Sequence, residues 1–313
     1  MISYIGEENF NIERKTVVTF GKFDGMHKGH QKLINKVVSI KEEKNIKSAI
    51  FTFAKPPVSF ITGNEVKNIY TREETICFLK QFNIDYLVEY PFNDIVRKME
   101  PKVFIRDIIA GMLNAKYVVV GTDFKFGYNR KGDFETLREY SKEYGYELII
   151  VEKEKDNSIG REISSTYIKE LLEAGKIKKA NELLGHNFSI CGDVIHGNEI
   201  GRTIGIPTLN VLPEKEKFLP LYGVYASKVK YAGKYYYGVT NIGKKPSIKG
   251  EHQAGAETHL FDFNDMIYGE KIEVELLEFI RPERKFESVE LLKRQLEEDV
   301  LKCNTSILCC FSM

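Results

Sequence analysis

The chain has 313 residues, of which 42% are apolar and 29% charged, and its formal net charge is +1. This length suits two domains of ordinary size, and the near-neutral charge argues against a broad electrostatic grip on nucleic acid or an anionic membrane. No apolar run approaches the roughly 20 residues of a membrane span, no signal peptide is apparent, and the five cysteines show neither a disulfide framework nor zinc spacing, so we expect a cytoplasmic protein.

Residues 1–185 alternate between short β-rich runs and segments with helical periodicity. The β-rich runs are TVVTFG, KSAIFTF, DYLVEYPF, KYVVVG and ELIIVE. Between the first two runs, four apolar residues fall on one helical face, namely Leu33, Ile34, Val37 and Val38. A second helical segment starts at Pro101, where proline suits a first turn. This alternation predicts an α/β domain with a doubly wound parallel sheet.

The first β-rich run ends in the segment GKFDGMHKGH, residues 21–30. His27 and His30 lie three residues apart at an expected helix start, so they share a helix face. Free N–H groups and partial positive charge at that end favour an anion such as a phosphate. The spacing alone leaves a structural role open, and a metal site is a rival reading in which Asp24 is the nearest further ligand. The chain contains neither a GxxxxGKS/T phosphate loop nor a GxGxxG fingerprint.

Ligands of parallel sheets bind beyond the carboxyl ends of the strands. Residues 21–30 follow the first β-rich run, and GTDFKFGYNRKGD (121–133) follows the fourth. We therefore expect these two segments to share one cleft.

The segment ISSTYIKELLEAGKIKKANELLG (163–185) predicts two short helices that end at Gly185. Its Ser164, Ser165 and Thr166 are good helix-capping residues. Near residue 185 the alternation of strand and helix patterns gives way to glycine-rich β runs, which divides the chain into domains 1–185 and 186–313.

The second domain has glycine-rich β runs without intervening helices, among them FSICGDVI, YGVYASKVKYA and KYYYGVTNIG. This pattern predicts an antiparallel barrel or sandwich. One closing helix is expected over about 287–302. Its expected buried stripe consists of Val289, Leu292, Leu296 and Val300, with a Glu290–Arg294 pair on the wet face.

The string GDVIHGNEIGRTIGIPTLNV (192–211) holds the main polar motif of the second domain. Its glycines can let backbone amides approach phosphates, although β-turns in a barrel are the better explanation when the glycines are taken alone. Thr208 and Asn210 lie two apart in an expected strand, so they face the same side. Both offer oxygen ligands suited to magnesium.

The ordered motifs GKFDGMHKGH, GTDFKFGYNRKGD and ISSTYIK resemble the adenylyltransferase module of bacterial bifunctional riboflavin kinase/FAD synthetases. The resemblance implies that His27 and His30 stabilise charge as the FMN phosphate attacks the α-phosphorus of ATP. It places Asp123 and Phe124 against the flavin nucleotide, and Asp24 near a histidine or a magnesium ion. Its ATP contacts would come from Gly21, Phe23, Asp24, Gly25, Gly29, Ser164, Ser165, Thr166 and Lys169.

The second domain resembles the riboflavin kinase module of the same family through PTLN, GVTNIGKKPSI and AETHLFDFNDMIYGEKIEV. The resemblance implies that Thr208 and Asn210 hold Mg²⁺ and that Glu257 takes the proton from the ribityl hydroxyl. A carboxylate in a partly desolvated cleft suits a general base. ATP would lie under the glycine loop, at Gly197, Gly201 and Gly205. His259 follows Glu257 by two residues, and a packed core histidine is the simpler reading for it.

The resemblance thus implies that the chain makes FMN from riboflavin and FAD from FMN, with ATP as co-substrate, Mg²⁺ as cofactor, and neither nucleic acid nor membrane as a partner. The oligomeric state is not indicated. One departure is Lys169, where the family usually has an arginine that can form a bidentate contact. A riboflavin kinase with a weak first module and a non-catalytic flavin-binding regulator are the alternatives.

Overall fold

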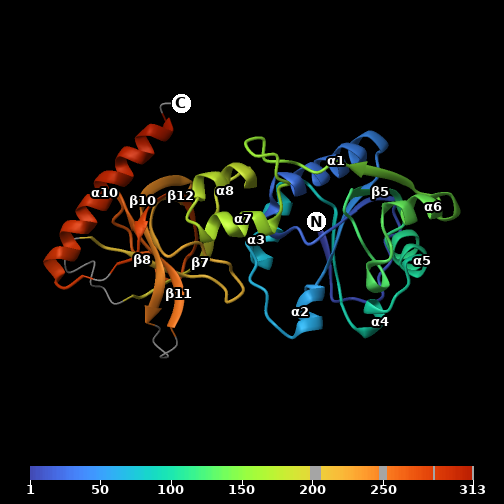
Figure 1. The fold of residues 1–313 in the computed structure, drawn as a ribbon, viewed down its shortest axis with the longest axis horizontal. Helices are drawn as coiled ribbons and strands as arrows, with labels where there is room; N and C mark the ends of the chain where they lie inside the picture. Colours follow the sequence, from blue (N-terminus) through green and yellow to red (C-terminus); the bar gives the residue numbers. More distant parts are fainter. Residues whose placement is uncertain (198–205, 247–251, 285, 312–313) are drawn as a thin grey trace. The chain divides into compact units, whose positions relative to one another are not determined.

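The structure is a computed structural model that describes residues 1–197, 206–246, 252–284 and 286–311. The chain forms two compact units (Figure 1). The first consists of residues 1–66 and 72–164, and the second of residues 67–71 and 165–313. The two helices between residues 165 and 185 therefore belong to the second unit.

The first unit is built on a six-stranded sheet in the order β1-β4-β3-β2-β5-β6, and all of its strand pairs are parallel. The strands are β1 (Ile2–Ile5), β2 (Thr16–Phe20), β3 (Lys47–Phe53), β4 (Tyr86–Tyr90), β5 (Ala115–Gly121) and β6 (Glu147–Val151). The helices are α1 (Lys28–Lys44), α2 (Pro57–Thr62), α3 (Arg72–Lys80), α4 (Asp94–Arg97), α5 (Pro101–Val103), which continues as a π-helix over Phe104–Met112, and α6 (Phe134–Tyr144). The prediction of a parallel α/β domain is confirmed.

Helices cover both faces of this sheet because successive side chains of each strand point to opposite sides. Val18 and Phe20 of β2 pack in one core cluster with Ile105 of the π-helix. Helix α1 packs against β2, and Ile34 and Val37 are among its buried residues. Leu33 and Val38 of the predicted stripe are half-buried, and Ile40 joins the buried face instead. The inner strands β2 and β4 are thus buried on both sides, as a doubly wound sheet requires, whereas the edge strands β1 and β6 are only partly buried.

The second unit contains a closed antiparallel barrel in the order β10-β11-β8-β7-β12-β9. Its strands are β7 (Ser189–Ile195), β8 (Leu209–Leu212), β9 (Gly223–Tyr231), β10 (Lys234–Pro246), β11 (His252–Leu260) and β12 (Lys271–Pro282). Its helices are α7 (Ser165–Glu173), α8 (Ile177–Leu184) and α10 (Val289–Phe311). Gly185 ends α8 with a φ of 80°, so the predicted stop is confirmed. The predicted barrel with a closing helix is also confirmed.

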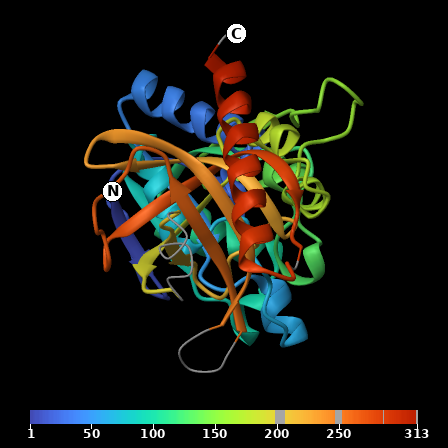
Figure 2. The same cartoon turned by 90° about the vertical axis from the view of Figure 1, so that its left-hand side faces the viewer.

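Helix α10 lies along the outside of the barrel (Figure 2), but its most buried residues are not the predicted ones. Leu292, Leu296 and Val300 are only half-buried, and the side chain of Val289 lies outside the described residues. The residues that are almost completely buried are Gln295, Asp299 and Cys303. The predicted apolar stripe is therefore wrong: the most buried face of α10 carries Gln295, Asp299 and Cys303 instead.

An ion pair explains why these polar residues of α10 are buried. Arg281 of β12 makes a bidentate contact with Asp299, with Nε 3.0 Å from Oδ1 and Nη2 2.7 Å from Oδ2. Gln295 adds a hydrogen bond from Nε2 to Asp299 Oδ1 at 2.9 Å. An acidic residue can be buried when a bidentate arginine satisfies it, and hydrophobic periodicity alone does not reveal such a partner. On the wet face Arg294 lies 3.9 Å from Glu298 rather than in the predicted pair with Glu290.

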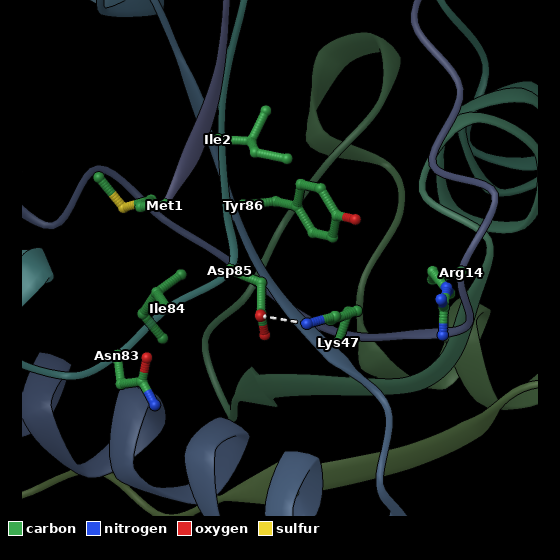
Figure 3. Close-up of a pocket in the computed structure, with 8 residues that line it drawn as sticks. All are labelled: Met1, Ile2, Arg14, Lys47, Asn83, Ile84, Asp85 and Tyr86. Carbon is green, nitrogen blue, oxygen red and sulfur yellow. Dashed lines mark hydrogen bonds and ion pairs between the residues drawn. The ribbon is translucent and has the colours of Figure 1, made fainter.

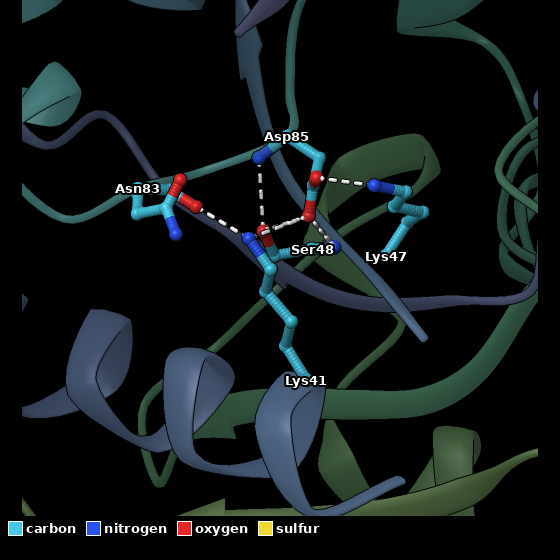
Figure 4. Close-up of polar contacts among 5 residues, drawn as sticks. All are labelled: Lys41, Lys47, Ser48, Asn83 and Asp85. Carbon is cyan, nitrogen blue, oxygen red and sulfur yellow. Dashed lines mark hydrogen bonds and ion pairs between the residues drawn. The ribbon is translucent and has the colours of Figure 1, made fainter. Parts of the chain in front are cut away.

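A second charge network lies at the amino end of the parallel sheet. A cavity of about 460 Å³ lies there, and Figure 3 shows Lys47 and Asp85 among the residues that line it. Asp85 precedes β4, and its Oδ1 accepts a hydrogen bond from Lys47 Nζ while its Oδ2 accepts from Ser48 N and Oγ, each at 2.9 Å (Figure 4). Lys41 Nζ also lies 2.9 Å from Oδ2. This carboxylate therefore ties α1, β3 and β4 together.

The same contacts make a pH-dependent contribution to stability. Burial opposes the charged form of Asp85, but hydrogen bonds from Lys41, Ser48 and Lys47 outweigh it and hold the pKa of Asp85 well below its usual range. A lowered pKa stabilises the fold above the unfolded value of about 4, and this stabilisation is lost as pH falls toward the folded value.

We expect Asp85→Asn to lower the free energy of unfolding of the first unit by about 2 kcal/mol at neutral pH, because a charged acceptor with several donors, only 17% exposed, is lost. The deficit relative to wild type should shrink as the pH is lowered below about 4. Urea unfolding followed by circular dichroism at several pH values measures both effects. Asp94→Asn is the matched control, because the Asp94 side chain is 69% exposed in its pair with Arg97. A deficit that stayed constant with pH would contradict the assignment.

Candidate active sites

The first candidate site starts at a strained turn where β2 ends. Phe23, Gly25 and Met26 have φ values of 52°, 77° and 45°. Left-handed conformations are costly for residues other than glycine and concentrate at functional sites. Gly21 permits this turn, because a Cβ there would lie 3.1 Å from the Phe23 ring. The turn is buried, and it ends at the start of α1.

The turn brings the two predicted histidines together on the first turn of α1. His27 is the N-cap, and its Nδ1 accepts a hydrogen bond from His30 N at 3.4 Å. The two rings stack with centroids 3.6 Å apart, and the Phe23 ring meets His30 edge-on at 5.3 Å. A Cβ on Gly29 would lie 3.2 Å from the His27 ring, so glycine leaves room for the imidazole.

The electrostatic environment keeps both imidazoles neutral at neutral pH. Burial lowers the pKa of His27 to about 4, although Asp24 and a backbone hydrogen bond act in the opposite direction. Burial also lowers the pKa of His30 well below its usual value, and the neighbouring His27 and Lys22 add to this effect. Each neutral ring carries one N–H group. The pair therefore offers donors, rather than fixed positive charges, to an anion.

His27 is 5% exposed, whereas His30 is half-buried, so the pair retains a side open to a ligand. Within the described residues, the buried Nδ1 atom of His30 has no hydrogen-bond partner. No three histidine, cysteine, aspartate or glutamate side chains in the described part of the chain gather as a metal site. The metal alternative for His27, His30 and Asp24 is thus not supported.

The loop after β5 supplies the next predicted residues. Asp123 is exposed, and its Oδ2 lies 3.0 Å from Lys153 Nζ. Phe124 is half-buried, and its ring packs 5.6 Å from Phe20 and 5.4 Å from Phe126. Asp123 is therefore available to a ligand, while Phe124 also belongs to the core that supports the turn after β2.

The capping residues lie where the sequence places them, around the start of α7. Ser165 is the first residue of α7, Ser164 precedes it and Thr166 is exposed. The boundary between the two compact units falls between Ser164 and Ser165. Lys169 lies one turn further on, where its Nζ donates to the carbonyl of Lys67 at 2.5 Å and lies 5.4 Å from the Phe218 ring. These contacts lie within the second unit.

The second candidate site lies on adjacent strands of the barrel. Thr208 Oγ1 donates to Glu257 Oε1 at 2.9 Å. Asn210 of β8 lies directly opposite Glu257 of β11 in the antiparallel register. Directly opposite side chains share a sheet face with Cβ atoms about 5 Å apart. The structure therefore brings together the three residues that the sequence predicts for the kinase site.

Gly197 belongs to the same site, because a Cβ there would lie 2.2 Å from Asn210 Nδ2. Gly201 and Gly205 lie outside the described residues, so the structure gives no account of them. His259 is half-buried rather than a core residue, and its Nδ1 lies 2.8 Å from the carbonyl oxygen of Pro207, which precedes Thr208.

Sequence reasoning misses Asn241, which lies opposite Glu257 on its other side, on β10. Its Nδ2 donates to Glu283 Oε1 at 3.5 Å. The row Asn241–Glu257–Asn210 therefore crosses three strands. The GVTNIG segment marks Asn241 as a strand residue, but only the strand register shows that it neighbours Glu257.

Comparisons with known proteins now bear on both sites. Residues 9–167 match the FAD synthetase family and residues 184–307 match the riboflavin kinase family. A relative from Buchnera aphidicola (Acyrthosiphon pisum strain), described as a bifunctional riboflavin kinase/FMN adenylyltransferase, is 38% identical over 93% of each chain. The chain belongs to the bifunctional riboflavin kinase/FMN adenylyltransferase family.

Further members of this family give the same picture. The Bacillus subtilis relative is 39% identical over 92% of this chain and 91% of its own, and the Escherichia coli relative is 35% identical over 91% and 90%. The FAD synthetase module carries the His27–His30 turn, and the riboflavin kinase module carries Glu257.

A crystal structure from Streptococcus pneumoniae, described as a macrolide-efflux protein, resembles this chain with a TM-score of 0.83 and 32% sequence identity. The match covers 95% of this chain and 96% of the Streptococcus pneumoniae chain. In the present chain, none of the helices in the described residues has the length and apolar character that crossing a membrane demands.

Proposed function

We propose that residues 1–185 transfer an adenylyl group from ATP to FMN, and that residues 186–313 phosphorylate riboflavin with ATP. The chain is a flavin-cofactor enzyme with two activities, using riboflavin, FMN and ATP and releasing FAD. The observation that carries the proposal is the Thr208–Glu257 hydrogen bond with Asn210 opposite, inside the module that matches riboflavin kinases. The change of family match between residues 167 and 184 supports the division near 185.

In the adenylyltransferase module, the neutral imidazoles of His27 and His30 donate N–H groups to phosphate oxygens of ATP. The FMN phosphate attacks the α-phosphorus and pyrophosphate leaves, so no protein nucleophile is needed. Fixed donors aimed at developing charge stabilise such a transition state. The positive end of α1, beside Gly25 and Gly29, adds to this field. The charge of Asp24 raises the pKa of His27 and so acts against the effect of burial.

Other ATP contacts of this module come from Ser164, Ser165 and Thr166 at the start of α7, and Asp123 faces the flavin nucleotide. Lys169 has the charge for a phosphate contact, but it lacks the fork of an arginine. Its hydrogen bond to Lys67 shows that the ammonium has a protein partner that it must exchange to reach ATP.

In the kinase module, Glu257 accepts the proton of the ribityl hydroxyl as that oxygen attacks the γ-phosphorus of ATP. The hydrogen bond from Thr208 fixes one carboxylate oxygen of Glu257. The Asn210 amide lies in the same row. The scattered cysteines of the sequence support a cytoplasmic location for this enzyme.

The residues present fit a magnesium ion. Thr208 and Asn210 contribute a hydroxyl and an amide oxygen, which are hard donors of the kind that Mg²⁺ takes alongside phosphates. The space above Gly197 is the cradle for the Asn210 side chain, since a Cβ would fill it. When bound, the ion neutralises phosphate charge during phosphoryl transfer.

Incubation of the purified chain with riboflavin, ATP and Mg²⁺, followed by chromatography, tests the proposal. FMN should appear first and FAD should follow. FMN as the end product would indicate a riboflavin kinase alone, and flavin binding without ATP turnover would indicate a regulator.

We expect Gly197→Ala to impair only the kinase, because the added Cβ displaces the Asn210 side chain. FMN formation at low Mg²⁺ should fall by about 10- to 100-fold, the usual cost of a misplaced positioning group. Raising Mg²⁺ should recover part of the loss. FAD formation from supplied FMN is the internal control, and an unchanged Mg²⁺ dependence of the kinase would contradict the proposed cradle.

A further inference from the structure

Lys153 occupies an unusual place among the charged residues at the carboxyl edge of the parallel sheet. It lies two residues beyond the end of β6, and its Nζ is 3.0 Å from Asp123 Oδ2 and 2.6 Å from Glu162 Oε2. Its side chain is 28% exposed, while those of Asp123 and Glu162 are 67% and 52% exposed. The lysine thus lies beneath two carboxylates that face outward.

The segment that carries Lys153 folds back on itself. Ile163 N donates to Glu154 O at 2.9 Å and Asp156 N donates to Arg161 O at 2.8 Å. Lys155 and Glu162 form an antiparallel bridge. Residues 153–163 are therefore a hairpin-like loop, and its returning arm leads directly into Ser164.

This loop lies beside the first turn of α1. The carbonyl oxygen of Ile163 lies 3.8 Å from the position of a Cβ on Gly29. Lys32 Nζ of α1 lies 3.0 Å from Glu154 Oε2. The loop after β6 is thus held near the His27–His30 pair on one side and, through Lys153, near the Asp123 loop on the other.

We propose that Lys153 is a positioning residue for adenylyl transfer: it holds the Asp123 loop against the arm that ends at Ser164. The proposal rests on the adenylyltransferase function assigned above. Its physical reason is charge, because both substrates of this module are anionic and two exposed carboxylates at their site would repel them. The ammonium of Lys153 neutralises these carboxylates and fixes the distance between the two loops.

The test compares Lys153→Met, Lys153→Arg and Lys102→Ala. Methionine keeps the length of the side chain and removes its charge, whereas arginine keeps the charge. Lys102 is the matched control, because it also pairs with a carboxylate of the first unit, Glu143, but does so at an exposed position. The readouts are kcat and KM for FMN in FAD formation from supplied FMN, with FMN formation by the same preparation as the measure of folding.

We expect Lys153→Met to lower kcat/KM for FMN by about 10- to 100-fold, as for other displaced positioning groups. Lys153→Arg should recover most of this loss, and Lys102→Ala should behave as wild type.

Three results would overturn the inference: a Lys153→Met variant within twofold of wild type, equal impairment in the Arg variant, or an equal loss of FMN formation. In each of these cases FAD formation by wild type leaves the proposed function standing. Absence of FAD formation by wild type would instead refute the adenylyltransferase assignment itself.

Discussion

Replacing Glu257 by glutamine is expected to lower FMN formation by about 100- to 10,000-fold, the range over which a general base contributes. Glutamine has nearly the same shape and can still accept the hydrogen bond that Thr208 Oγ1 donates to Oε1 at 2.9 Å. It cannot take a proton from the ribityl hydroxyl. The loss should therefore appear in kcat, measured by chromatography of FMN at saturating riboflavin and ATP.

The controls for Glu257→Gln use the second activity and a second carboxylate. FAD formation from supplied FMN should be unchanged, because the other module performs it. Glu273→Gln should leave both activities intact, since Glu273 is an exposed residue of β12. Loss of both activities in a folded Glu257→Gln variant would contradict the division of labour between the two modules.

Most of the first unit can be predicted from sequence because its inner strands, such as β2 and β4, are buried on both faces. Continuous β-branched runs such as those of β2 and β5 stand out, and the structure places strands within each of the five predicted runs. Strand β1 escapes prediction, because Ile2 and Ile5 are exposed and its four residues gain their strand character by pairing with β4. Edge strands of this kind depend on a tertiary partner.

The closing helix shows where periodicity fails. An apolar pattern predicts which face is buried only if polar residues stay in water. Asp299 is fully buried because Arg281, 18 residues earlier, supplies a bidentate partner. The small apolar cluster beneath the helix includes Cys303, with Val300 packed against it, but neither Leu292 nor Leu296. A long-range ion pair has no signal in the local pattern.

The kinase site is predictable in part because strand alternation fixes faces. Thr208 and Asn210 are two residues apart, so they share a face once the strand is recognised. The place of Asn241 beside Glu257 depends on the register between β10 and β11, which a single sequence does not encode locally. The role of Lys153 is similarly hidden, because its partners come from two loops.

Replacing both His27 and His30 by alanine is expected to lower FAD formation from supplied FMN by at least about 100-fold, because each ring supplies a donor to developing phosphate charge. FMN formation should stay at the wild-type level. His27→Asn separates the two roles of His27. Asparagine is among the best N-cap residues, so it preserves the acceptor for His30 N but removes the outer ring nitrogen.

We expect His27→Asn to keep the stability of α1 and to lose most FAD formation, as measured by thermal unfolding and by chromatography of FAD. Retention of FAD formation would show that His27 acts only as a helix cap.

The pH dependence supplies an independent check. Because burial lowers the pKa of His27 to about 4 and that of His30 well below its usual value, both rings are already neutral at neutral pH. An inflection of kcat/KM for ATP near the ordinary histidine pKa of about 6.5 should therefore come only from the phosphates of free ATP, and it should be the same in wild type and in His27→Asn. An inflection there that disappears in His27→Asn would mean that the free enzyme carries a charged imidazolium at this turn, and the neutral-donor mechanism would be wrong.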